Sequence, residues 1–195
     1  MEFVLATNNQ KKLKEMQQIL QDGCRTFMTL AQAGVQVDPE EDGTTFEANA
    51  LIKARAACAA SGKAAIADDS GLEVDALGGE PGVYSARYCP GTDADRVDYL
   101  LEKLRDVPRE QRTARFVSAI ACVLPDGTEF TVRGACEGEI TFACAGAGGF
   151  GYDPVFYVPS CGGTFAEIPQ EEKNRISHRG CALALLRAEM EKRGL

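Results

Sequence analysis

Apolar residues near the start of the chain change from a short run to a helical period. Within residues 2–6, an uninterrupted apolar run follows Glu2. Leu13, Met16, Ile19 and Leu20 then recur at helical spacing. This pattern predicts a buried strand, a polar connection and then an amphipathic helix.

The rest of the chain continues this alternation. Further apolar runs predict strands at 26–30, 64–67, 115–124, 128–134 and 155–157. Helical spacing and capping residues predict helices over 46–61, from Thr92 or Asp93 to Leu104, over 169–175 and through Leu183, Leu186 and Met190. Between two of the strands, Pro125-Asp126-Gly127 predicts a hairpin turn. Strands alternating with helices predict an α/β fold.

The stretch 63–87 organises the rest of the chain. Its apolar run meets two adjacent acids, Asp68 and Asp69, and Ser70 and Gly71 follow. We interpret this as a buried strand that ends in paired carboxylates and a tight turn, at the sheet edge where ligands of α/β proteins gather. Two adjacent like charges raise the free energy of the folded protein unless a cation lies between them, and that cation is usually a bound metal ion.

An acidic segment, 38–43, precedes the 46–61 helix. Four acids in five residues are typical of a solvated loop, but one of them could complete a metal site with Asp69. Thr44 and Glu47 have the spacing of a capping box. Asn49 and Lys53 share one face of this helix, and Lys53 could serve a phosphate, hold the acids in place or be solvated.

Two loops carry candidate ligand groups. The polar segment 7–12 lies where a helix N-terminus and lysines could bind a phosphate, but it lacks the glycine spacing of a P-loop, so an ordinary helix cap is favoured from these residues alone. The glycine-rich segment 146–154 is usually a flexible loop, although Phe150 or Tyr152 could stack on a ring and Asp153 could accept a hydrogen bond.

Composition limits the function classes. A chain of 195 residues with 45% hydrophobic residues fits one domain, or one domain with two lobes. The net charge of −8 argues against binding to nucleic acid, and no apolar run is long enough to span a membrane. The chain shows no secretion signal, and eight scattered cysteines without a CxxC pair favour reduced thiols in the cytoplasm.

Four segments together carry a resemblance to a known family. They are LATNNQKKLKE at 5–15, the stretch from FEANALIKARAA to GVYSARY at 46–88, GGFGYDPVF at 148–156 and EEKNRISHRGCAL at 171–183. In this order they resemble the inosine triphosphate pyrophosphatase family, and the resemblance covers essentially the whole chain, 1–195, as a single domain.

The resemblance implies a fold and an activity. The fold would be a long mixed β-sheet flanked by helices, in two lobes with a nucleotide cleft between them. The enzyme would be a cytoplasmic homodimer that uses Mg²⁺ and hydrolyses ITP, dITP and XTP between the α- and β-phosphates, releasing the monophosphate and pyrophosphate.

The resemblance also implies roles for individual residues. Asp69 would accept a proton from water and bind the metal together with Glu41, although adjacent Glu40 leaves that register open by one. Asp68 would support the site. The substrate contacts would be Thr7, Asn8, Asn9, Gln10, Lys11, Lys12, Ser70, Phe150, Gly151, Tyr152, Asp153, Lys173, His178 and Arg179.

The chain departs from the family pattern at one position, and other functions must be weighed against the one that the resemblance implies. The family often has glycine where this chain has Asn8, a residue that tolerates left-handed backbone geometry. A nucleotide-binding module without catalysis, or a pyrophosphatase of different base specificity, would share many of the motifs. A Nudix-type hydrolase is disfavoured because its glutamate-rich helix motif is absent. His178 is the single histidine, so a hydrolase triad is poorly supported.

Overall fold

The computed structural model describes residues 1–20 and 25–195, which form two compact units. Unit 1 contains the described residues of Met1–Asp69, Ser118–Gly134 and Arg179–Leu195. Unit 2 contains Ser70–Val117 and Ala135–His178.

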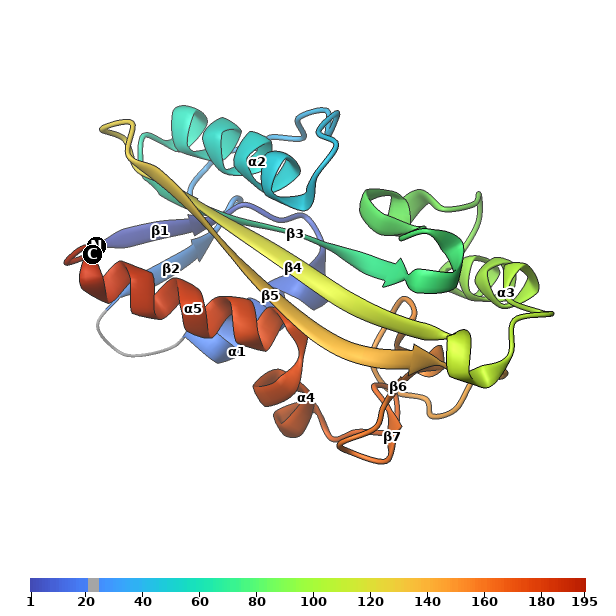
Figure 1. The fold of residues 1–195 in the computed structure, drawn as a ribbon. Helices are drawn as coiled ribbons and strands as arrows, with labels where there is room; N and C mark the ends of the chain where they lie inside the picture. Colours follow the sequence, from blue (N-terminus) through green and yellow to red (C-terminus); the bar gives the residue numbers. More distant parts are fainter. Residues whose placement is uncertain (21–24) are drawn as a thin grey trace. The chain divides into compact units, whose positions relative to one another are not determined.

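The strands form one mixed sheet, as expected (Figure 1). Its order is β2-β1-β3-β4-β5-β6-β7. The strands are β1 Glu2–Leu5, β2 Thr26–Thr29, β3 Ala64–Val74, β4 Thr113–Val123, β5 Glu129–Ile140, β6 Phe156–Val158 and β7 Gly163–Thr164. Strand β1 pairs in parallel with β2 and β3, whereas β6 pairs antiparallel with β5 and β7. The three longest strands, β3, β4 and β5, pass from one unit into the other.

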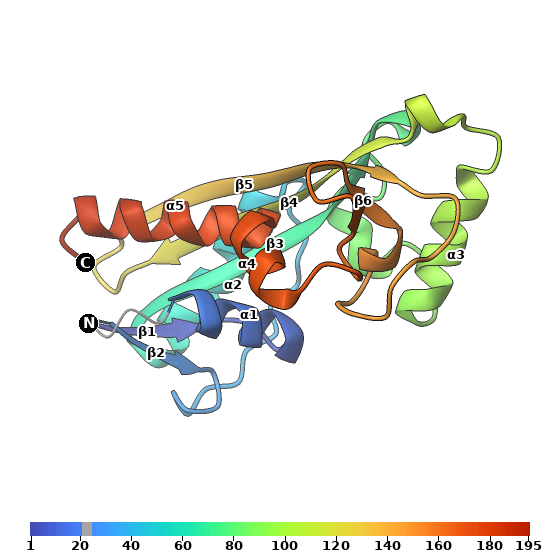
Figure 2. The same ribbon diagram turned by 90° about the horizontal axis from the view of Figure 1, so that it is seen from below.

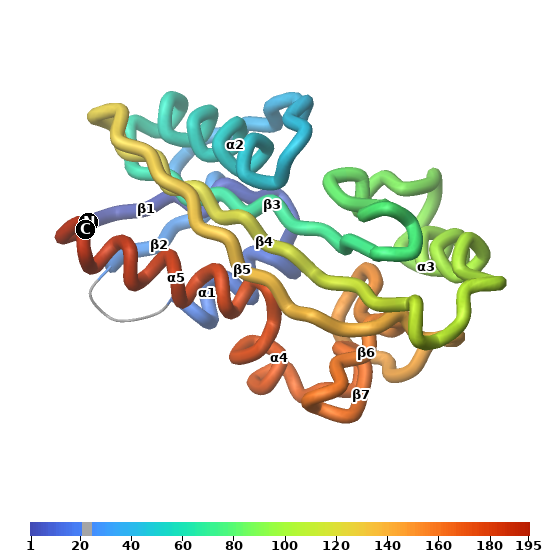
Figure 3. The backbone as a smooth tube through the Cα atoms, viewed as in Figure 1, coloured from blue at the N-terminus to red at the C-terminus, as the bar shows by residue number. Residues whose placement is uncertain are grey.

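Five α-helices accompany these strands in the described part of the chain, and the tube in Figure 3 traces their connections. They are α1 Gln10–Leu20, α2 Phe46–Ser61, α3 Asp93–Lys103, α4 Gln170–Ile176 and α5 His178–Lys192. Short 3-10 helices lie at Asp75–Leu77, Gly82–Arg87, Arg109–Gln111 and Asp153–Val155.

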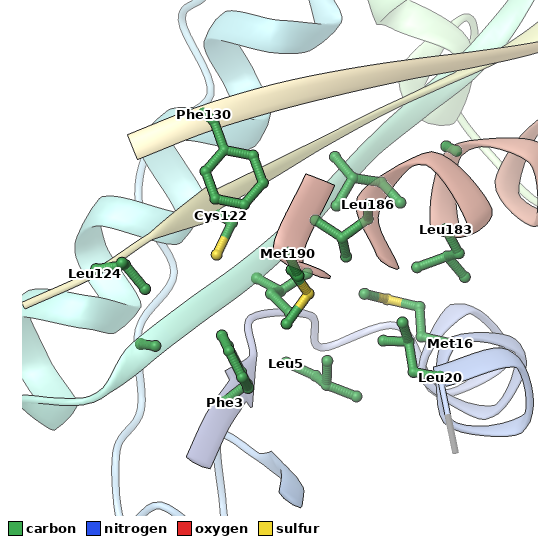
Figure 4. Close-up of a cluster of buried hydrophobic side chains, with 14 of the residues drawn as sticks. Phe3, Leu5, Met16, Leu20, Cys122, Leu124, Phe130, Leu183, Leu186 and Met190 are labelled. Atoms are coloured by element: carbon green, nitrogen blue, oxygen red, sulfur yellow. The ribbon is translucent and has the colours of Figure 1, made fainter. Parts of the chain in front are cut away.

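The strands of unit 1 bury a different set of side chains on each face. On one face, residues such as Leu5 and Ile66 pack with α1 and α5 in a cluster that includes Met16, Leu183 and Leu186 (Figure 4). On the other face, their neighbours in sequence pack against the alanine-rich side of α2. Figures 1 and 2 show these helices from two directions. Because successive side chains of a strand alternate between faces, β3 serves two separate cores.

The core of unit 2 combines packed aromatic rings with aliphatic side chains. Phe116 contacts both Phe156 and Phe165, with ring centroids 4.6 and 5.7 Å apart, and Val155 and Leu72 are fully buried in the same cluster.

The predicted helices and strands are confirmed, with two corrections. Strand β3 does not end at the paired acids: it continues through Asp68, Asp69 and Ser70 to Val74. Nor is the cap of α2 a Thr44–Glu47 capping box, because Thr45 is the N-cap and its hydroxyl accepts from Ala48 N at 3.1 Å. The end of α2 is as predicted, with Gly62 in left-handed geometry at φ 67°.

None of the helices within 1–20 and 25–195 combines the length and the apolar character that crossing a bilayer requires. The seven cysteines in these ranges are all free thiols. Cys24 lies outside the described residues.

Candidate active site

The alternation of β3 separates its two acids. Ala64 and Ile66 face the α1 and α5 core, so Asp68 continues that face. Ala65 and Ala67 face the α2 core, so Asp69 points to the opposite side. Adjacent carboxylates therefore have different ion-pair and hydrogen-bond partners.

Asp68 lies at the centre of a buried ionic network. Its side chain has no exposed surface, and its Oδ2 atom lies 2.8 Å from Lys12 Nζ and 3.3 Å from Arg179 Nη2. The Ser118 hydroxyl donates to its Oδ1 atom. Burial alone would raise the pKa of Asp68, but Arg179 and Lys12 together hold that pKa well below its ordinary value. Asp68 is therefore a fixed anion.

The same network extends to α1. Glu15 is buried although charged, and it forms an ion pair with Arg179, which is only 2% exposed. Arg179 thus joins α5 to both α1 and β3, with a carboxylate on either side of its guanidinium. In this structure Arg179 is held by protein groups.

Asp69 has a different set of neighbours, all from α2 and the acidic loop. Its Oδ1 atom lies 2.9 Å from Lys53 Nζ, and Asn49 Nδ2 donates to its Oδ2 atom at 3.3 Å. Lys53 Nζ also lies 2.8 Å from Glu41 Oε2, so one ammonium bridges two carboxylates. Burial, with repulsion by Asp68, raises the pKa of Asp69 above its ordinary value, and Lys53 and Lys12 oppose this rise.

Glu41 and Asp69 therefore converge on one cation. Their oxygens are hard ligands of the kind that Mg²⁺ prefers, and both reach a single point that Lys53 Nζ now occupies. Within 1–20 and 25–195, no set of three or more His, Cys, Asp or Glu side chains is arranged to hold a metal. The residues fit a metal held by two carboxylates, with its other ligands coming from water or phosphate.

The 7–12 segment caps α1. Asn9 Oδ1 accepts from the backbone N–H groups of Lys11 and Lys12 at 3.0 and 3.2 Å, and the Thr7 hydroxyl accepts from Asn9 N. Asn8 is exposed, and no non-glycine residue in the described ranges has a positive φ, so the loop does not use left-handed geometry at Asn8. Residues 8–11, Gln10 included, are exposed, which suits a phosphate-binding loop, whereas Thr7 and Lys12 are half-buried and Lys12 is bound to Asp68.

The predicted base-binding segment lies in unit 2 and is held by Asp153. This buried carboxylate accepts from Phe150 N and lies 2.7 Å from Lys173 Nζ. A Cβ on Gly149 would lie 2.0 Å from Asp153 Oδ2, so the loop at this point requires glycine. The predicted contacts Asp153 and Lys173 are thus brought together, and they bind each other.

The remaining predicted contacts of unit 2 are largely enclosed by protein. Tyr152 is buried and its hydroxyl donates to Ser85 O at 2.9 Å, whereas Gly151 N donates to Asp93. His178 is buried and stacks on Phe116, with centroids 4.7 Å apart. Ser70 is half-buried on β3.

Sequence reasoning assigned no role to three buried polar groups that shape the site. They are Ser118, which interrupts an apolar run, Glu15 on α1, and Asn49, which is fully buried on α2. For Ser118, a polar residue inside a run that the strand pattern assigns to the core was the available signal.

Comparisons with known proteins show which family this chain resembles over nearly its whole length. A sequence model of the Ham1 family matches residues 3–189. The dITP/XTP pyrophosphatase of Symbiobacterium thermophilum is 55% identical over 182 residues, covering 93% of this chain and 91% of that protein. A dITP/XTP pyrophosphatase of Thermus thermophilus is 53% identical and covers 96% and 91%. The solved HAM1 protein of Coxiella burnetii is 44% identical, with a TM-score of 0.90, covering 98% of this chain and 99% of that one.

Proposed function

The chain belongs to the Ham1 family, and on this premise we propose that it is a nucleoside triphosphate pyrophosphatase acting on the non-standard purine nucleotides dITP, XTP and ITP. It hydrolyses the bond between the α- and β-phosphates and releases the monophosphate and pyrophosphate. The observation that carries this function is the identity above 50%, over nearly the whole chain, with relatives named dITP/XTP pyrophosphatase. The family resemblance expected from four sequence segments is thereby confirmed.

Asp69 is our candidate for the catalytic base. Hydrolysis of a phosphoanhydride requires a positioned water that loses a proton as it attacks. A base works best when its pKa approaches the working pH, and burial shifts the pKa of Asp69 in that direction. Asn49 fixes the direction of this carboxylate by donating to its Oδ2 atom.

Glu41 and Asp69 are our candidates for the metal ligands, as the convergence of their carboxylates supports. A magnesium ion bound there would neutralise charge on the phosphate oxygens. Lys12 adds positive charge near the same strand and is held in place by Asp68. The 7–12 loop, with its exposed residues 8–11 and the capped start of α1, is the proposed phosphate contact.

The proposed contacts to the purine base lie in unit 2, except Arg179, which belongs to unit 1. A loop pinned by Asp153 presents Phe150 with Lys173 Nζ 5.0 Å from its ring centroid, a rigid aromatic group suited to stacking. A 6-oxo purine accepts hydrogen bonds where adenine donates one, so backbone N–H groups or the His178-Arg179 pair would reject ATP. Homodimer formation, a cytoplasmic location and the absence of nucleic-acid binding are proposed on the family resemblance and the net charge of −8.

The test is a panel of dITP, ITP, XTP, GTP and ATP with magnesium, with separate detection of pyrophosphate and inorganic phosphate. We expect pyrophosphate as the product, and turnover of the first three far above that of GTP and ATP. Release of inorganic phosphate would indicate a stepwise phosphatase. Equal rates on GTP would leave a pyrophosphatase of different base specificity, and no release at all would leave a binding module.

A further inference from the structure

Helix α2 holds the candidate metal ligands through two side chains one turn apart. Asn49 is fully buried: its Nδ2 donates to Asp69, and its Oδ1 accepts from Gly43 N at 2.9 Å. A Cβ on Gly43 would lie 2.6 Å from Asn49 Oδ1, so the packing here is tight. Asn49 therefore fixes both Asp69 and the backbone of the acidic loop two residues after Glu41.

Lys53 holds the same two elements in a different manner. Its Nζ atom reaches Glu41 Oε2 at 2.8 Å and Asp69 Oδ1 at 2.9 Å, and its side chain keeps 16% of its surface exposed. A lysine is a compact charge on a flexible four-carbon stem, so it can leave a contact by rotating its side chain. Asn49 is fully buried, whereas the Lys53 side chain keeps part of its surface in solvent.

We propose that Lys53 is a resident cation, whose ammonium holds Glu41 and Asp69 together in the metal-free protein and withdraws when a divalent cation binds between them. The inference rests on the proposed metal pair. Two cations cannot share the one point at which both carboxylates converge, because each needs the same oxygens and they repel each other. Asn49 keeps the two ligands near their final positions while the cations exchange.

This arrangement has a thermodynamic signature. Without Lys53 and without metal, two carboxylates face each other in a partly buried site, and the folded protein is less stable. With metal bound, Lys53 no longer contributes to holding the pair, so its removal has little effect. The stability difference between the wild type and a Lys53 variant should therefore depend on magnesium.

The experiment measures thermal unfolding of EDTA-treated protein, with and without saturating magnesium and with no nucleotide present. For Lys53→Met we expect the metal-free midpoint to fall by roughly 3–6 °C and the deficit to vanish in magnesium. The matched control is Lys63→Met, which removes an exposed lysine paired with Glu2 in the same unit. The unfolding midpoint of Lys63→Met should differ little from that of the wild type, and the difference should be the same with and without magnesium.

A second variant separates exchange of cations from a general effect of charge. Lys53→Arg keeps the charge, and its planar guanidinium binds carboxylates more firmly. The metal-free midpoint should then be retained, whereas magnesium affinity by calorimetry should fall about tenfold. If Lys53 affects the metal through its charge alone, Lys53→Arg and the wild type will bind magnesium equally.

The possible results distinguish the two proposals. A Lys53→Met deficit that persists in saturating magnesium overturns the exchange, with Lys53 remaining beside the metal or serving a phosphate. No effect of magnesium on either protein overturns both the metal pair and the exchange. The nucleotide panel, run on the same wild-type sample, reports separately on whether the protein is a pyrophosphatase.

Discussion

Asp68 and Asp69 are neighbours in the sequence, yet the structure treats them in opposite ways. Asp68 faces α1 and α5, has no exposed surface and is bound by two cations whose combined effect lowers its pKa. Asp69 faces α2, and burial raises its pKa. The difference follows from the strand's period of two, which places adjacent side chains on separate faces.

The comparison explains how one site can be both rigid and reactive. The network around Asp68 joins α1, α5 and β4 to the centre of β3 through Lys12, Arg179 and Ser118, and the Asp68 side chain itself has no exposed surface. The Asp69 side chain keeps 12% of its surface exposed, and its ion-pair partner is the single half-buried lysine Lys53. One carboxylate thus fixes the elements of unit 1, and the other is left with a partner that can be exchanged.

The largest expected effect separates the two acids by activity. Asp69→Asn keeps the size of the side chain but removes the proton acceptor, so turnover of dITP should fall by roughly 10²–10⁴-fold. The thermal midpoint should change by only a few degrees, because a carboxylate that burial already disfavours is replaced by a neutral group. Pyrophosphate release and thermal unfolding check this prediction together. A variant that keeps most of its activity would remove Asp69 from the mechanism.

The next largest expected effect is a loss of stability when Asp68 is replaced. Asp68→Asn leaves Lys12 and the buried Arg179 with one anion fewer, and loss of one partner from a buried network costs roughly 3–5 kcal/mol. Urea unfolding measures it. The control is Glu129→Gln, which breaks the exposed pair with Arg55 and should cost less than about 1 kcal/mol. Equal costs at the two positions would show that the network around Asp68 is not stabilising.

The elements of this fold could be predicted because their signals are local. The helix predicted over 46–61 matches α2, and the predicted Pro125-Asp126-Gly127 turn joins β4 to β5. The course of β3 past its acids could not be predicted in this way. The cations that stabilise two carboxylates inside this strand come from positions 12, 53 and 179. These positions are distant from β3 in the sequence, so the local pattern around the acids does not predict their contacts.

The sequence identified many residues of the candidate site, but not which of these residues bind each other. The resemblance marks Asp153, Lys173 and Arg179 as substrate contacts, and it does not show that Asp153 and Lys173 bind each other or that Arg179 binds Glu15. Ion pairs between distant positions depend on the packing of whole helices. For Lys53, the residues alone left three roles open, and the structure shows it bound to the acids.

A smaller effect compares the neutral partners of the two acids. Ser118→Ala removes the hydroxyl that donates to Asp68, and we expect a loss of about 1–3 kcal/mol in stability. Asn49→Ala should cost a similar amount, but it should also lower turnover by roughly tenfold because Asp69 loses its orientation. Urea unfolding and pyrophosphate release on both variants give the comparison. A larger loss of turnover in Ser118→Ala would reverse the roles of the two faces.

The smallest expected effect is a difference of sign in the response to acid. The folded-state pKa of Asp68 is depressed, so its stabilising contribution is present above the ordinary pKa of about 3.9 and is lost as the pH falls through the lower folded value. The folded-state pKa of Asp69 is raised, so the folded protein binds this proton first and gains stability as the pH falls through that value.

In EDTA, the stability difference between wild type and Asp68→Asn should therefore shrink on acidification below about pH 4. The wild type should gain relative to Asp69→Asn as the pH falls toward about 4. Urea midpoints measured across this range test both trends, and two trends of the same sign would mean that the neighbouring carboxylates share one environment.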